Sequence, residues 1–189
     1  MLRPGRLREL LLPPEEAAEL DVPGSVDAAV LIPLFARDGE PVSVFTERRG
    51  DLKRHAGEIS FPGGRQDLPD EDLRETALRE AEEEIGLPRA AVELVGALPP
   101  TGTFVTSYRI HPFVGVIEPG HPWAPQPSEV ERVLELSLPE LVRGHESKRL
   151  LSKGVPFKTP TYTVDGHFVW GATARIFEGL LAHLEPLLG

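Results

Sequence analysis

The chain has 189 residues, 40% of them hydrophobic and 26% charged, and it contains no cysteine. This composition predicts one globular domain with a substantial core. The absence of cysteine excludes disulfides and thiolate chemistry, and we expect a cytoplasmic protein. The formal net charge of −10 argues against nucleic acid as a partner, because binding to phosphates requires a basic protein surface. No apolar run approaches the ~18 residues of a membrane helix, so no membrane partner is expected either.

Residues 5–20 look helical, with an interruption at Pro13 and Pro14, and we expect residues 1–24 to form an N-terminal helical arm. The arm can reach a partner subunit or pack on its own domain, so a monomer and a homodimer both stay open. Residues 25–189 are expected to form the single main domain.

Strands are predicted where apolar runs or alternating patterns are bounded by turn residues. The first two, at 25–35 and 41–46, are separated by a turn at residues 37–39, and Asp165-Gly166 marks a second hairpin within 161–169. The remaining predicted strands are 59–61, 91–98, 108–117 and 130–136.

Three helices are predicted after the second strand: about 70–85, 138–142 and 172–188. Asp67 or Asp70 is the expected N-terminal cap of the first, and Gly86 suits its left-handed stop position. The pattern indicates an α+β fold, with a mixed β-sheet sandwiched between α-helices.

The helix at 70–85 carries four glutamates within five residues. At ~3.6 residues per turn, Glu80 and Glu84 share one face, Glu83 lies on the same flank, and Glu82 points away. One interpretation is a solvated acidic face. The other is a group of carboxylates for a hard cation such as Mg²⁺, which prefers oxygen ligands and bridges carboxylates to phosphates.

The segment before this helix favours the cation. We call residues 61–64 the FPGG segment, after their sequence. Its two glycines let the backbone turn sharply and approach a ligand closely. Their carbonyl groups offer one further oxygen ligand beside the acidic helix.

Residues 64–87, GRQDLPDEDLRETALREAEEEIGL, resemble a Nudix box, G-x5-E-x7-R-E-U-x-E-E-x-G-U with U apolar. Gly64 precedes Glu71 by seven positions, where the box has six. The matching residues are Glu71, Arg79, Glu80, Ala81, Glu83, Glu84, Gly86 and Leu87.

Residues 44–64, VFTERRGDLKRHAGEISFPGG, resemble the extended signature of Nudix coenzyme A pyrophosphatases. Thr46, Arg48, Gly57 and the FPGG segment are in register, whereas Arg49 stands where Ser or Ala is usual. The expected arginine falls on Lys53, or the neighbouring Arg54 substitutes for it. Residues 170–176 also resemble the start of that subfamily's C-terminal helix, so the resemblance covers about residues 25–185.

The resemblance implies metal-dependent hydrolysis of the pyrophosphate bond of coenzyme A or its thioesters, giving 3′,5′-ADP and 4′-phosphopantetheine. Mg²⁺ or Mn²⁺ is the implied cofactor. Three alternatives stay open: the same reaction on ADP-ribose or NADH, a non-catalytic nucleotide-binding regulator on the same fold, and a simple acidic interaction domain.

By the same resemblance, Glu80 and Glu84 are the principal metal ligands, with Gly64 as a further ligand. Glu83 is a further ligand or a base for the attacking water, and Arg79 orients the glutamates through ion pairs. Glu71 either joins the metal site or stabilises the helix start, where negative charge is favoured. Outside the box, Glu129 and Glu131 are candidates for the general base, with exposed strand carboxylates as the alternative interpretation.

An anionic substrate also needs cations, and Arg48, Arg49, Lys53 and Arg54 cluster with His55 in an otherwise acidic chain. Arginines such as Arg48 and Arg54 can bind phosphate bidentately, and the 3′-phosphate of coenzyme A gives a reason for more than one. The alternative interpretation is solubilising loop charge.

Overall fold

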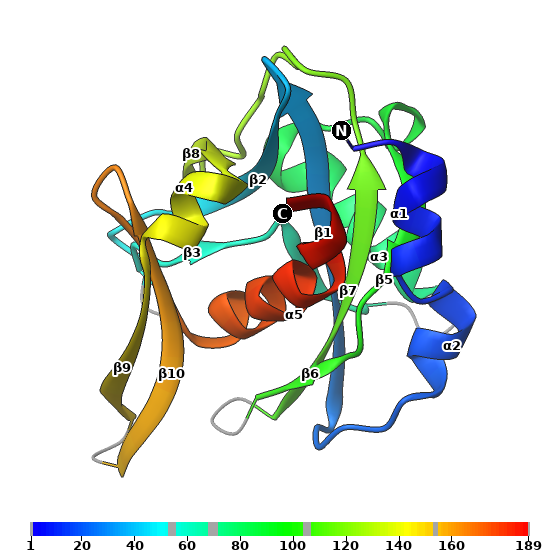
Figure 1. Ribbon diagram of the computed structural model, residues 1–189. Coiled ribbons are helices and arrows are strands. Elements are labelled where there is room, and N and C mark those ends of the chain that lie inside the picture. Colours follow the sequence, from blue (N-terminus) through cyan, green and yellow to red (C-terminus); the bar gives the residue numbers. More distant parts are fainter. Residues whose placement is uncertain (1, 53–55, 68–71, 104–106, 153–154, 189) are drawn as a thin grey trace.

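The computed structural model describes residues 2–52, 56–67, 72–103, 107–152 and 155–188. A main β-sheet lies between helices on both of its faces, and a smaller sheet stands beside it (Figure 1). The strands of the main sheet are β1 (Val26–Arg37), β2 (Glu40–Arg48), β3 (Ile59–Ser60), β4 (Gly63–Arg65), β5 (Glu93–Ala97), β6 (Thr101–Gly102), β7 (Tyr108–Val116) and β8 (Val130–Ser137). The smaller sheet contains β9 (His145–Ser152), β10 (Val155–Val164) and β11 (His167–Val169).

The helices are α1 (Pro4–Leu10), α2 (Pro14–Glu19), α3 (Leu73–Ile85), α4 (Leu138–Arg143) and α5 (Gly171–Leu188), with a 3₁₀ turn η1 at Arg89–Ala91. The central strand order is β3-β2-β1-β7-β5, while β4 pairs with β1, β6 with β7 and β8 with β2. β1 and β7 are parallel, and the other pairs are antiparallel. The predicted α+β fold with a mixed sheet between helices is therefore confirmed.

β1 reads as a nearly continuous apolar run because it lies at the centre of the sheet and is covered on both faces. Ile32 and Leu34 point into one core with α5, whereas Leu31 and Phe35 point into a second core with α3. Alternate residues of one strand thus join the two helical layers.

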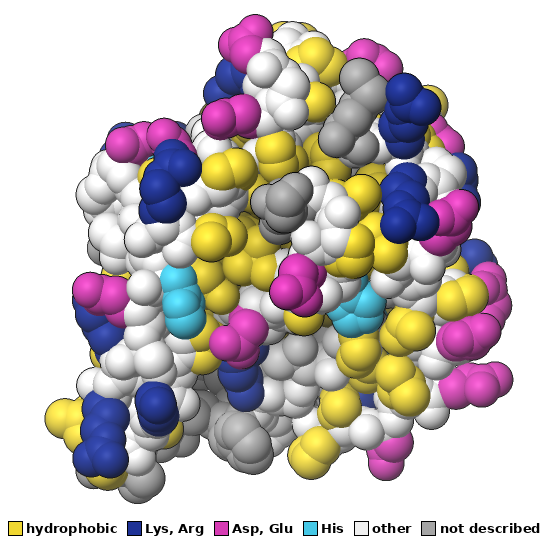
Figure 2. All heavy atoms as spheres, in the orientation of Figure 1, with side chains coloured by type: hydrophobic (Ala, Val, Ile, Leu, Met, Phe, Trp, Pro, Cys, Tyr) yellow, Lys and Arg dark blue, Asp and Glu magenta, His cyan; other side chains and the backbone are white. Residues whose placement is uncertain are grey.

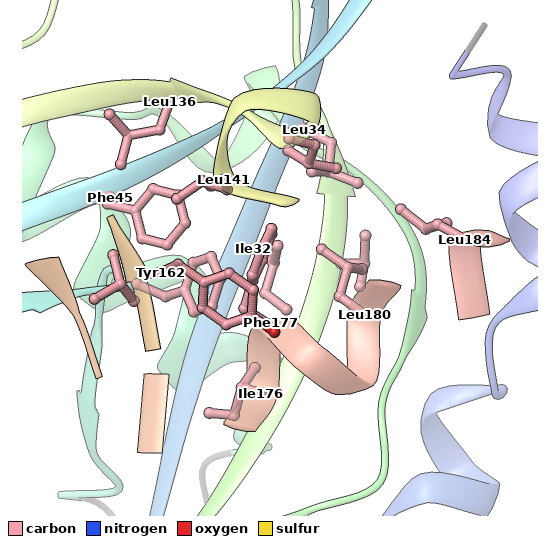
Figure 3. Close-up of a cluster of buried hydrophobic side chains, with 14 of the residues drawn as sticks. Ile32, Leu34, Phe45, Leu136, Leu141, Tyr162, Ile176, Phe177, Leu180 and Leu184 are labelled. Atoms are coloured by element: carbon pink, nitrogen blue, oxygen red, sulfur yellow. The ribbon is translucent and has the colours of Figure 1, made fainter. Parts of the chain in front are cut away.

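The core on the α5 side includes side chains from both sheets (Figure 3). Phe177 of α5 meets Tyr162 of β10 edge to face, with ring centroids 4.8 Å apart, and lies 6.4 Å from Phe45 of β2. The smaller sheet is therefore anchored to the main domain through α5.

The predicted N-terminal helix is two short helices, α1 and α2. Between them, Leu12 exchanges backbone hydrogen bonds with Ala97 of β5, at 3.1 and 2.9 Å. Leu12 precedes Pro13, a position that disfavours helical backbone. Leu7 and Leu11 are buried in the core that contains α5.

The N-terminal cap of α3 is Asp72, so the prediction of Asp67 or Asp70 is wrong. The Asp72 side chain accepts a hydrogen bond from the Arg74 N–H at 2.8 Å, and the helix begins at Leu73, its first apolar residue facing the sheet. Asp70 and Glu71 lie outside the described residues. The predicted end is confirmed, because Gly86 adopts the left-handed conformation with φ 70°.

The predicted hairpin turns are also confirmed, with positive φ at Asp38-Gly39 and Asp165-Gly166. β9 and the first part of β10 were not predicted, since His145–Ser152 shows no clear apolar alternation. The β9–β10 hairpin extends beyond the main sheet, and Lys and Arg side chains gather near its end (Figures 1 and 2). Within the described residues, no helix is long and apolar enough to cross a membrane.

Candidate active site

The FPGG segment lies directly against the acidic helix. β4 pairs with β1 so that Gly64 is opposite Ala29, whose side chain belongs to the core under α3. A Cβ atom added at Gly64 would lie 2.5 Å from Cδ of Glu80, closer than real Cβ contacts. Glycine at this position lets the Glu80 carboxylate pack against the backbone.

Glu84 is the most buried of the acidic cluster. Its side chain is 7% exposed, and Oε2 accepts a hydrogen bond from the Gly63 N–H at 3.0 Å. Desolvation raises the pKa of Glu84 to about 8, the Gly63 hydrogen bond opposes the rise, and the charges of Glu80 and Glu129 add to it. Desolvation also raises the pKa of Glu80, against the effect of Arg79. The nearby arginines and the Gly63 N–H therefore do not fully offset the desolvation of the ionised Glu80 and Glu84 carboxylates.

Arg79 joins the acidic helix to the preceding loop. Its Nη1 donates to Glu80 Oε1 at 2.9 Å and to Glu83 Oε2 at 3.3 Å. Its Nη2 donates to the carbonyl of Arg65 at 3.4 Å and lies 4.0 Å from Asp67. One guanidinium thus restrains two of the predicted site carboxylates and the end of β4.

Among the described residues, no group of three or more histidine or acidic side chains is arranged to hold a metal ion on its own. Glu83 is 58% exposed and lies with Arg79, while Glu82 faces outward near Arg89. The residues that do converge are Glu80, Glu84 and the backbone of the FPGG segment. These oxygen donors fit Mg²⁺ or Mn²⁺, because a divalent cation would relieve the repulsion between the buried Glu84 and the half-buried Glu80 and keeps several waters of its own.

The loop between β7 and β8 closes the end of α3. The N–H groups of Ala124 and Gln126 donate to the carbonyls of Ile85 and Glu84, at 3.0 and 2.8 Å. This docking brings Glu129 to within 3.8 Å of Arg48 and near enough to Glu84 to raise its pKa. Glu131 is exposed, and its charge acts on Arg49. The charge of Glu129 therefore acts on Glu84, whereas the charge of Glu131 acts on Arg49.

The four predicted substrate cations divide into three groups. Arg48 is partly buried, its charge lowers the pKa of Glu84, and its Nε has no hydrogen-bond partner among the described residues. Arg49 is held by Asp51, at 2.9 and 2.7 Å, and by the Pro127 carbonyl at 2.6 Å. Lys53 and Arg54 lie outside the described residues, as does His55.

A cavity of 220 Å³ opens on the α5 side of the FPGG segment. Its wall includes Phe61, Gly63 and Gly64, together with Tyr108 and Ile110 of β7. The first two turns of α5 cover it with Ala172, Thr173 and Ile176. Gly63 and Gly64 therefore border both the carboxylate pair and the accessible cavity.

Three site features were not predicted from the sequence. These are the Gly63 N–H that holds Glu84, the loop at Ala124–Gln126 and the α5 wall of the cavity. The first two act through backbone groups, which leave no signal in residue type. Only the resemblance of residues 170–176 to a subfamily motif hinted at the third.

Residues 25–154 match the NUDIX domain family. The chain is 38% identical over 155 residues to a protein of Salmonella paratyphi B named "Uncharacterized Nudix hydrolase NudL", covering 81% of this chain and 80% of that protein. Among solved structures, the NUDIX domain of Shewanella oneidensis NrtR complexed with ADP ribose aligns with a TM-score of 0.57 at 13% identity, over 93% of this chain and 97% of that one. A MutT/nudix family protein from Enterococcus faecalis also aligns with a TM-score of 0.57, at 14% identity, over 92% of this chain and 67% of that one.

The fold, together with the acidic helix α3 packed against the FPGG segment, defines a hydrolase of the class that acts on nucleotide-linked compounds. The family match extends over more than half of the chain, and the curated relatives are named Nudix hydrolases. The chain belongs to the Nudix family.

Proposed function

We propose that the protein hydrolyses the pyrophosphate bond of coenzyme A or its thioesters, releasing 3′,5′-ADP and 4′-phosphopantetheine or its acyl derivative. One observation carries the proposal. Within residues 44–64, which resemble the coenzyme A signature, the described part includes the end of β2 and all of β3 and leads from β3 into the FPGG segment that contacts Glu80 and Glu84. This continuity supports a single site that includes the substrate signature and the carboxylate pair.

In this reaction water attacks one phosphorus of the pyrophosphate, and the bond from that phosphorus to the bridging oxygen breaks. The water oxygen stays on one product, the bridging oxygen leaves on the other, and the water proton passes to a base. Bound at Glu80, Glu84 and the Gly64 carbonyl, Mg²⁺ or Mn²⁺ would supply charge neutralisation for the pyrophosphate and a lower pKa for water.

The protein's own groups have separate roles in this proposal. Arg79 holds Glu80 and Glu83 in place through its contacts at 2.9 and 3.3 Å. Glu129 is the proposed general base, because it is half exposed and its charge already reaches Glu84. Arg48 is the proposed phosphate ligand, since its charge lowers the pKa of Glu84 and its buried Nε donor has no partner within the described structure.

Comparison of coenzyme A with dephospho-coenzyme A, ADP-ribose and NADH tests the proposal. We expect the highest kcat/KM for coenzyme A, with dependence on Mg²⁺ or Mn²⁺. Dephospho-coenzyme A differs from coenzyme A by the 3′-phosphate alone, so the ratio of their kcat/KM values measures recognition of that group. A higher kcat/KM for ADP-ribose or NADH would refute coenzyme A as the substrate, and no metal-dependent turnover of any of the four would favour a regulator.

A further inference from the structure

A second and larger cavity, of 630 Å³, adjoins the one beside the FPGG segment. Tyr108 lines the smaller cavity, and its chain neighbour Ser107 lines the larger. β6 continues the same surface, because Thr101 pairs with Ile110 of β7. On α5, Thr173 and Ile176 face the smaller cavity, and Arg175 faces the larger. The two cavities are therefore lined by adjacent residues of the segment entering β7 and of α5.

The walls of the larger cavity are held by backbone contacts. Ser25 N–H donates to the Ser107 carbonyl at 2.8 Å, and Thr103 N–H donates to the Tyr108 carbonyl at 2.8 Å. Gly102 packs so closely on the segment before β1 that an added Cβ would lie 2.5 Å from the Pro23 carbonyl oxygen. The cavity is thus largely preformed, and its volume falls within the ~300–1,000 Å³ of small-molecule sites.

The chemistry of the larger cavity is mostly neutral. Val22, Pro23 and Pro100 supply apolar surface, and Thr101 and Ser107 supply hydroxyl groups, whereas the hydroxyl of Thr103 is bonded to the backbone of Tyr108. Arg175 is the only charged side chain among the described residues that line it, and one of its N–H groups reaches the Gly102 carbonyl at 3.1 Å. Such a wall suits an uncharged chain with carbonyl acceptors better than a phosphate dianion, which favours several cations.

The position of the cavity separates the two ends of a bound substrate. Arg48 lies at the end of β2, on one side of β1, whereas β7 and β6 lie on the other side. A pyrophosphate bound at the FPGG segment has Arg48 on the β2 side and the mostly neutral wall of the larger cavity on the β6 side. The phosphorylated nucleotide end fits the first direction, and an uncharged arm fits the second.

We propose that the larger cavity binds the pantetheine arm, an uncharged chain with two amide groups, and so determines the specificity for the non-nucleotide half of the substrate. The inference rests on the proposed function for the choice of arm. It assigns specificity to Val22, Ser25 and Arg175, which lie outside the Nudix box.

Calorimetric binding of the two products in the presence of Mg²⁺ tests this assignment independently of turnover. Val22→Trp fills the cavity from its half-buried wall, and Ser25→Trp obstructs it from an exposed position that carries little risk for folding. Leu20→Trp is the matched control, because Leu20 is 43% exposed and is not one of the residues that line the cavity in the described structure.

We expect each cavity variant to weaken the binding of 4′-phosphopantetheine by about tenfold or more and to leave the affinity for 3′,5′-ADP within about twofold of the wild-type value. Leu20→Trp should change neither affinity. Unchanged 4′-phosphopantetheine binding in both cavity variants would overturn the inference. So would selective loss of 3′,5′-ADP, equal loss of both products, or no binding of 4′-phosphopantetheine to the wild-type protein. If 4′-phosphopantetheine behaves as expected while coenzyme A is not hydrolysed, the proposed function fails and the assignment of the cavity stands.

Discussion

Oε2 of Glu84 lies 3.0 Å from the amide nitrogen of Gly63, so the last turn of the acidic helix is joined to the FPGG segment by one hydrogen bond. The carboxylate is 7% exposed, and the nearby charges of Glu80 and Glu129 repel it. The single hydrogen bond from the neutral Gly63 N–H offsets little of the free-energy cost of burying the charged Glu84 carboxylate. The metal-free protein therefore contains a local source of instability at its proposed reaction centre.

The contribution of Glu84 to the stability of the metal-free protein is expected to fall as the pH rises from 5 to 8.5. The folded-state pKa of Glu84, about 8, lies above its ordinary value of 4.5, so the folded state binds this proton more tightly than the unfolded state. The resulting stabilisation is complete below pH 4.5 and is lost as the pH rises through 8. In the Glu84→Gln variant this part of the fall should be absent, and its Tm at pH 8.5 should exceed the wild-type Tm by about 5 °C. Equal pH slopes of Tm in chelator-treated wild type and variant would contradict this.

The same Glu84→Gln substitution is expected to lower kcat by about two orders of magnitude or more while the protein stays folded, because the amide removes charge from the proposed metal ligand. Glu82→Gln is the matched control, since Glu82 is on the same helix but faces outward near Arg89. Steady-state assays with saturating Mn²⁺ give the comparison. Similar activities in the two variants would remove Glu84 from the site.

Gly64→Ala is expected to displace the Glu80 carboxylate, because the new Cβ would lie 2.5 Å from Cδ of Glu80. We expect the rise in Tm caused by Mn²⁺ to shrink along with activity. Gly179→Ala in α5 is the control, where an added Cβ meets nothing within 4 Å and helix propensity predicts a gain of about 0.5–1 kcal/mol. A Gly64→Ala protein with the full Mn²⁺ response would show that this close contact is unimportant for metal binding.

Arg79→Gln is expected to reduce kcat by at least about tenfold with a small effect on stability, since Arg79 contacts Glu80, Glu83 and the Arg65 carbonyl together. Arg89→Gln removes another arginine of this region, which contacts Glu75 and Glu82. Exposed ion pairs of this kind contribute roughly 0–1 kcal/mol, so this control should retain activity. Parallel measurements of kcat and Tm separate an effect on the site from an effect on folding.

Much of the fold could be predicted because its signals are local. Gly86 ends α3 with a left-handed conformation that glycine adopts readily, and Asp165-Gly166 makes a tight turn for a similar reason. Within α3, Ala77, Ala81 and Ile85 recur at helical spacing and are all buried. In each case a short sequence pattern has one dominant structural outcome.

Other features depend on contacts between distant segments. β9 is held by β10 and lacks a clear apolar pattern, so its strand forms through pairing that the local sequence does not reveal. At the site, the helix periodicity placed Glu80 and Glu84 on one face, but it could not show that Gly63 would bind Glu84 or that Gln126 would cap the helix end. The choice of Asp72 over two nearby aspartates as the cap depends on where Leu73 meets the sheet.

The β9–β10 hairpin leaves one edge of β9 without a strand partner among the described residues. An open strand edge can pair with another chain, and lysine is a common deterrent because bringing two such edges together confronts like charges. Residues 145–164 contain three of the four lysines in the chain, together with Arg149. Replacing Lys148 and Arg149 with neutral residues would therefore favour aggregation at low ionic strength, even though both lie far from any proposed chemistry.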